Sequence, residues 1–97
     1  MTAPVLTDEL RSRVESGAAW LDLHHPGWHD LIDVDVLDLD DCYSCVLGQV
    51  IGDFWKASIT WGEALAMGFQ ARNGVHLVAE GEALTRAWTE LIERRQT

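Results

Sequence analysis

The chain has 97 residues, five tryptophans and 47% hydrophobic residues, which suffices for one small core and argues against disorder. We therefore expect a single domain over residues 1–97. The formal net charge of −9 disfavours direct binding to nucleic acid or to an anionic membrane, and no apolar run approaches the roughly 20 residues of a membrane span.

The negative charge lies in the middle of the chain. Between Arg13 and Lys56 there is no lysine or arginine, whereas nine acidic residues occur there: Glu15, Asp22, Asp30, Asp33, Asp35, Asp38, Asp40, Asp41 and Asp53. Outside this stretch the charges balance. Such a block is compatible with a basic protein partner, with mimicry of DNA, and with a solvated face that serves only solubility.

Residues 7–23 predict an amphipathic helix. Thr7 is a candidate N-cap, and apolar residues recur on one face at helical spacing: Leu10, Val14, Ala18 and Leu21. Gly17 weakens a helix by about 1 kcal/mol relative to alanine, so we expect a packing reason for it. The helix should end before Pro26, because helical geometry is disfavoured for the residue that precedes a proline.

An acidic linker is expected next. A single helical turn is predicted at residues 28–31, and residues 32–40 then alternate between apolar and acidic side chains with one slip in phase. This pattern fits a short strand with a bulge or an extended linker whose apolar side chains hold it to the core. We favour the linker, because a lone strand leaves its backbone groups without partners.

The segment 42–56 is predicted to be the central helix, capped by Asp40 or Asp41. Apolar side chains surround it on nearly all sides: Val46, Leu47, Val50, Ile51, Phe54 and Trp55. Gly48 and Gly52, four residues apart, should form a shallow face that a second helix can approach closely.

Two further helices are predicted after this segment. Thr60 and Glu63 form a capping box that opens a helix over residues 61–67, which Gly68 can close. Residues 69–78 are expected to hold a turn at 72–74 and an extended stretch. Residues 80–94 predict the final helix, with an apolar face made of Leu84, Trp88, Leu91 and Ile92.

The expected fold class is thus mainly α. We expect about four helices in one compact domain, with an acidic extended linker before a central helix and the C-terminal helix packed across it. The five tryptophans are interpreted as core residues rather than as a platform for a ligand: Trp20, Trp28, Trp55, Trp61 and Trp88.

Cys42 and Cys45 form a CxxC motif at a predicted helix start. A helix N-terminus lowers the pKa of a thiol, as in dithiol redox sites, but the adjacent aspartates oppose a thiolate. In a zinc interpretation, Cys42 and Cys45 join His25 and His29 in a four-ligand set. In a packing interpretation, Cys45 is a core residue and the histidines lie at the surface. Packing is favoured, so no metal ligand, cofactor or catalytic residue is assigned.

Several stretches of the chain carry a resemblance to known proteins. They are Gly17-Ala-Ala-Trp-Leu-Asp, Pro26-Gly27-Trp28, Ile32-Asp33, Leu37-Asp38-Leu39, Cys42-x-x-Cys45-Val46-Leu47-Gly48-Gln49 and Leu84-Thr85-x-Ala87-Trp88-x-x-x-Ile92. With this pattern the chain resembles a group of small uncharacterised proteins of actinobacteria and their phages. The resemblance implies a phage or mobile-element source and brings no activity.

These observations predict a non-enzymatic accessory protein that acts by binding another protein with a basic surface. Three alternatives stay open: a small domain stabilised by zinc on Cys42, Cys45, His25 and His29, an acidic DNA mimic, and, least favoured, a dithiol redox protein. Residues 1–9 carry acids where a signal peptide has basic residues, and no apolar segment follows them. We therefore expect the protein in the cytoplasm of a bacterial host.

Overall fold

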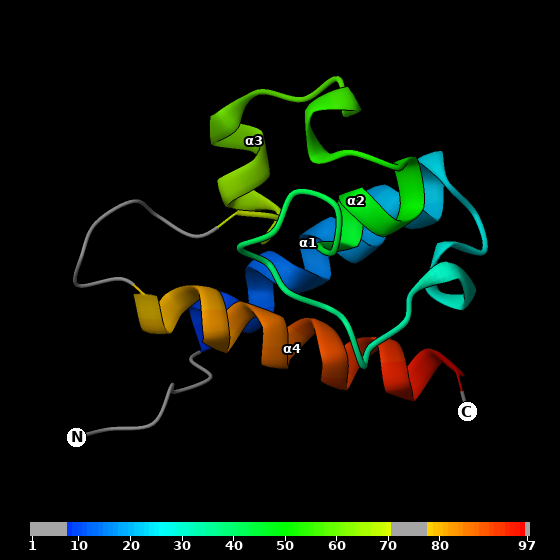
Figure 1. Ribbon diagram of the computed structural model, residues 1–97. Helices are drawn as coiled ribbons and strands as arrows, with labels where there is room; N and C mark the ends of the chain where they lie inside the picture. Colours follow the sequence, from blue (N-terminus) through cyan, green and yellow to red (C-terminus); the bar gives the residue numbers. More distant parts are fainter. Residues whose placement is uncertain (1–7, 71–77, 97) are drawn as a thin grey trace.

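The computed structural model describes residues 8–70 and 78–96, and every regular element in these residues is helical (Figure 1). The two long helices are α1 (Asp8–His24) and α4 (Val78–Gln96). Between them lie α2 (Val46–Ile51), α3 (Trp61–Ala66) and two short 3-10 helices, η1 (Trp28–Leu31) and η2 (Phe54–Lys56). The predicted mainly α fold is confirmed.

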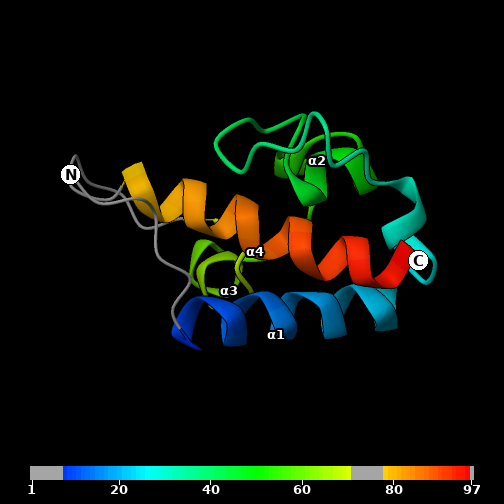
Figure 2. The ribbon, with the colours of Figure 1, turned by 90° about the horizontal axis from the view of Figure 1, so that it is seen from below.

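Helices α1 and α4 lie side by side and run in the same direction, as Figure 2 shows along their length. An ion pair near each end holds this register. Arg13 of α1 lies 3.2 Å from Glu80 in the first turn of α4, and Asp22 lies 2.8 Å from Arg95 near the helix C-termini. Because neighbouring parallel helices need a long connection, the intervening segment must cross back over the pair, and it carries the shorter elements.

Trp88 of α4 occupies the centre of the core. Its side chain is fully buried, and its indole N–H donates to the Gly68 carbonyl at 2.7 Å, so the polar end of the ring is satisfied. The ring stacks on Phe69 with 5.4 Å between ring centroids and meets Trp28 edge-on at 5.7 Å. The central helix of the fold is therefore α4.

The prediction of one central helix over 42–56 was wrong. Helix α2 begins only after Cys45, whose sulfur accepts a hydrogen bond from the Gly48 N–H at 3.2 Å, so neither Asp40 nor Asp41 is its N-cap. It ends at Gly52, where φ is +104°, a left-handed conformation that strains any residue with a Cβ atom.

The loop around α2 is closed by backbone contacts. The Phe54 N–H donates to the Cys42 carbonyl at 2.9 Å. The backbone of Cys42 and Tyr43 also approaches Gly48 so closely that a Cβ atom there would overlap the Cys42 carbonyl. The expectation that Gly48 and Gly52 form a docking face for another helix was therefore wrong, because the loop already covers Gly48.

The remaining helices agree with the sequence to within a few residues. Gly17 has the expected packing reason, because a Cβ atom there would overlap the Met67 carbonyl and lie 2.9 Å from the Trp88 ring. The capping box is present, with Glu63 N–H donating to Thr60 Oγ1 at 3.1 Å and Thr60 N–H to Glu63 Oε1 at 2.7 Å. The proposed N-cap Thr7, the turn predicted at 72–74 and the extended stretch predicted at 75–77 lie outside the described residues. Val78, also predicted to be extended, instead begins α4.

Candidate functional site

The aspartates of the central segment hold backbone turns. Asp33 accepts from the Asp35 N–H at 3.0 Å and Asp38 accepts from the Asp40 N–H at 2.9 Å. Asp41 accepts from the N–H groups of Tyr43 and Ser44, and Asp53 accepts from that of Trp55. This is the usual role of aspartate at a turn, so part of the acidic block has a local structural reason.

The same segment is fixed to the core by its apolar side chains. Ile32, Leu37 and Leu39 are buried, as the linker interpretation expected. The Leu39 N–H donates to Thr85 Oγ1 of α4 at 3.1 Å, and the Asp33 N–H donates to Gln49 Oε1 of α2 at 2.7 Å. The segment consists of consecutive turns rather than an extended chain. It therefore presents its carboxylates on a well-anchored surface.

Asp40 lies at the junction of this segment with α4. Its carboxylate packs on Gly81 in the first turn of α4, where a Cβ atom would lie only 2.7 Å from Asp40 Oδ1. Partial burial raises the pKa of Asp40, and the charges of Asp38 and Glu82 raise it further. None of the described basic residues forms an ion pair with this carboxylate. Desolvation and the neighbouring negative charges therefore disfavour its ionised form without compensation from a nearby described cation.

Aromatic side chains lie next to Asp40. Trp55 is 70% exposed and Trp61 is 41% exposed, and both pack edge-on against the buried Phe54, with 5.1 and 6.5 Å between ring centroids. Trp55 is held by η2, whose N-cap is Asp53, and Trp61 is the first residue of α3, between the capping-box residues Thr60 and Glu63. Both rings are therefore positioned by capped helical turns.

These side chains border a cleft, here called the aromatic cleft, of about 200 Å³. It is lined by Leu39, Asp40, Cys42, Cys45, Phe54, Trp55, Trp61 and Gln70. A second hollow of about 160 Å³ shares the rings of Phe54, Trp55 and Trp61 and is also bordered by Ala57, Ile59 and Thr60. In Figure 1 helix α3, which carries Trp61, and the segment between α2 and α3, which carries Phe54 and Trp55, lie above α4.

The prediction that all five tryptophans are core residues was wrong for Trp55 and Trp61. Only Trp28 and Trp88 are fully buried, and Trp20 is half-buried against Phe69. The apolar spacing of segment 42–56 suggested a single helix that would bury Trp55. The signal that could have corrected this is the pair Gly52-Asp53, a helix-ending residue followed directly by a helix-capping residue.

The two cysteines are both free thiols. Cys45 is 2% exposed, and burial raises the pKa of its thiol above the ordinary value, although the N–H groups of Gly48 and Leu47 oppose the effect. Cys42 is half-buried at the wall of the aromatic cleft. A buried thiol with a raised pKa is a packing residue that caps a helix, as the packing interpretation expected.

The histidines of the zinc hypothesis lie among aromatic rings. The His25 ring lies 5.8 Å from that of Trp20, and the His29 ring lies 5.7 Å from that of Trp28, with Nδ1 3.4 Å from Asp30. Within residues 8–70 and 78–96, no three His, Cys, Asp or Glu side chains are grouped to hold a metal ion. The zinc set of Cys42, Cys45, His25 and His29 stays a prediction.

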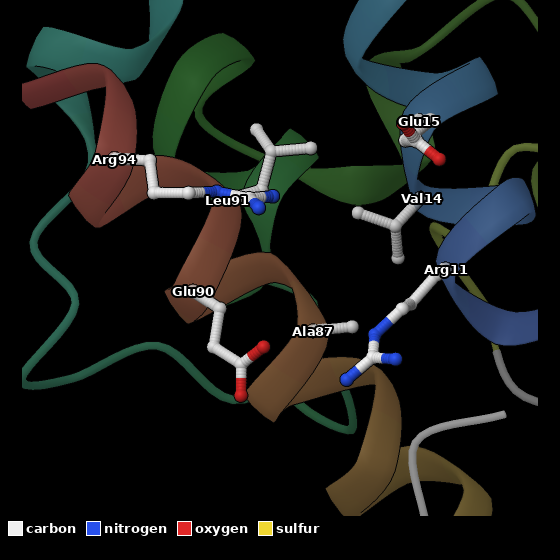
Figure 3. Close-up of a pocket in the computed structure, with 7 residues that line it drawn as sticks. All are labelled: Arg11, Val14, Glu15, Ala87, Glu90, Leu91 and Arg94. Atoms are coloured by element: carbon white, nitrogen blue, oxygen red, sulfur yellow. The ribbon is translucent and has the colours of Figure 1, made fainter. Parts of the chain in front are cut away.

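A separate groove lies between the two long helices, with a volume of about 310 Å³. Figure 3 shows Arg11 and Glu15 of α1 across it from Glu90 and Arg94 of α4. Its floor is made of buried core side chains: Val14, Ala87 and Leu91. The rim of the groove thus carries charges of both signs.

None of the helices in the described parts of the chain is long and apolar enough to cross a lipid bilayer. No protein-family model, no curated protein and no solved structure matches this chain.

Proposed function

We propose that this chain is a non-enzymatic accessory protein that binds another protein through the surface around Trp55 and Trp61. The observation that carries the proposal is the exposure of two large, well-positioned indole rings beside Asp40, whose carboxylate forms no ion pair with the described residues. Tryptophan is enriched among the residues that dominate binding energy at protein interfaces, because it buries a large area with few rotatable bonds. Tyr43, which follows the cleft residue Cys42 in the chain, is also largely exposed.

The partner should present a basic surface. The segment between Arg13 and Lys56 carries nine acidic residues and no basic one, and the exposed aspartates 33, 35, 38, 40 and 41 lie on it. Complementary charge accelerates association and excludes acidic partners. The sequence resemblance supports a phage or mobile-element source, in which case the partner is a protein of the bacterial host cytoplasm or of the phage itself.

The test is capture of a partner from a host lysate by wild-type protein and by a Trp55→Ala/Trp61→Ala variant. We expect a captured protein to be lost with the variant, because its rings supply the contact area. Leu23→Ala is the matched control, since Leu23 is 76% exposed but lies on α1 outside this surface. Raising the salt concentration from about 0.05 M to about 0.5 M should weaken the complex. A partner retained by the double variant would contradict the proposed surface.

A further inference from the structure

We infer that the aromatic cleft receives one arginine side chain of the partner, with its guanidinium beside a tryptophan ring and paired with Asp40. This inference rests on the proposed function and names the chemistry of its partner. It is carried by three features of the cleft: its size, its aromatic walls and the unbalanced charge of one wall.

The size of the cleft suits a single side chain. Its volume is about 200 Å³, below the roughly 300–1,000 Å³ of sites that enclose small-molecule ligands. The cleft is formed between the turn at residues 39–42 and the rings of η2 and α3, and buried Phe54 and Cys45 make part of its lining. A long, thin side chain can enter such a space while the rest of its protein stays on the surface.

The walls favour a flat cation. The partly exposed side chains of Trp55 and Trp61 line the cleft. A guanidinium stacks on an indole ring through both its charge and its planarity. The aliphatic part of arginine can lie against Leu39 and Phe54, which line the same space. The ammonium group of lysine is more strongly hydrated and lacks the planar surface.

Asp40 supplies the charge that the cation would neutralise. Its carboxylate lines the cleft, is partly desolvated, and is repelled by Asp38 and Glu82. A positive side chain beside it would replace these repulsions with a charge-assisted hydrogen bond, which is among the stronger polar contacts. The structure thus holds half of an ion pair in position before binding, and its other half is a cation that the described residues do not provide.

The experiment titrates ¹⁵N-labelled protein with the peptide acetyl-Gly-Arg-Gly-amide and follows the five indole N–H resonances. We expect saturable shifts for Trp55 and Trp61. The indole groups of Trp28 and Trp88, hydrogen-bonded to Asp22 and Gly68, serve as internal references that should stay unchanged. The same peptide with citrulline, which has the shape of arginine without its charge, should not saturate. The lysine peptide should bind more weakly than the arginine peptide.

The decisive variant is Asp40→Asn, which keeps the size of the side chain and removes its charge. We expect it to weaken binding of the arginine peptide about tenfold, the effect of losing one charge-assisted pair. Asp35→Asn is the matched control, because it makes the same charge change on an exposed residue that does not line the cleft, and it should alter the affinity less than about twofold.

Equal affinity of wild type and Asp40→Asn, or equal binding of the citrulline peptide, would overturn the inference. If a captured partner nevertheless depends on Trp55 and Trp61, the proposed function stands and only the arginine contact fails. If no partner depends on these rings but the peptide still binds through Asp40, the cleft recognises arginine and the proposed function fails instead.

Discussion

The aspartates of the central segment act first on their own backbone. Each of Asp33, Asp38, Asp41 and Asp53 accepts a hydrogen bond from an N–H two residues further along the chain. Asp40 differs, because its carboxylate lies against α4 and beside the aromatic cleft. The acidic block thus contains aspartates that also shape turns, together with Asp40, which lines the aromatic cleft.

Replacing a buried and an exposed tryptophan tests which of them contributes to the core. Trp88→Ala should destabilise the protein by about 3–5 kcal/mol, because it leaves a cavity in place of the ring that now packs against Phe69 and Trp28. Trp55→Ala should change the free energy of unfolding by less than about 0.5 kcal/mol, since most of that side chain is in solvent. Urea denaturation measures both, and equal effects would mean that the core is misplaced.

The thiols should react slowly in the native protein. Burial raises the pKa of Cys45, so we expect iodoacetamide to leave it unmodified at neutral pH until the protein unfolds. Half-buried Cys42 should react first, and mass spectrometry after timed alkylation separates the two. Rapid alkylation of both thiols below pH 7 would instead favour the dithiol redox hypothesis.

At the scale of elements, glycine determines where the middle segment stops being helical. In Gly52→Ala the new side chain must adopt φ near +104°, and we expect a loss of about 1 kcal/mol of stability. Gly62→Ala is the opposite case within α3, because an added Cβ atom meets nothing closer than 3.9 Å. That change should stabilise the protein by about 0.4–1 kcal/mol, because alanine lowers the conformational entropy of the unfolded chain. Thermal unfolding of both variants tests the assignment of α2 and α3.

The pairing of α1 with α4 should depend on acid. The Arg95 guanidinium, and then the Trp28 indole, hold the pKa of Asp22 below its usual value of 3.8. A lowered pKa gives stability that is present above pH 3.8 and is lost as the pH falls through the lowered pKa. Because the pair is solvent-exposed, it should contribute less than about 1 kcal/mol.

Asp22→Asn should therefore be less stable than wild type at neutral pH, and the two proteins should converge in acid. Urea unfolding between neutral pH and about pH 3 measures the difference, with Asp35→Asn as a control of equal charge change. A difference that persists unchanged at the acid end would assign the effect to packing rather than to charge.

At the scale of the whole molecule, helices with one clear apolar face were predictable and their interruption was not. The spacing of Leu10, Val14 and Leu21 identified α1, and that of Leu84, Trp88 and Ile92 identified α4. In the segment 42–56, apolar residues occur on all sides, so periodicity could not reveal that the backbone leaves the helix at Gly52. The aromatic cleft could not be predicted for the same reason, because it forms only if α2 ends at Gly52 and Trp55 lies in the separate helix η2.

The last prediction concerns the acidic segment. Asparagine can take the place of aspartate in its turns while removing the negative charge. The change Asp33→Asn, Asp35→Asn, Asp38→Asn and Asp40→Asn removes four of the formal −9 charges. The asparagine side-chain oxygen can still accept the N–H bonds that Asp33 and Asp38 accept now. The fold should therefore persist, with an unchanged helical circular dichroism spectrum.

The stability of this variant should change with pH in a defined direction. The pKa of Asp40 is raised above 3.8, so its contribution to stability is full below pH 3.8 and is lost as the pH rises through the raised pKa. Asparagine does not ionise and so does not lose this contribution. The quadruple variant should therefore become more stable than wild type as the pH rises from acid to neutral, where the carboxylates of the wild type repel one another.

The same variant should no longer bind a basic partner, whether that partner recognises DNA-like charge or the aromatic cleft. A variant that folds, gains stability and still binds the partner would mean that the acidic block serves only solubility.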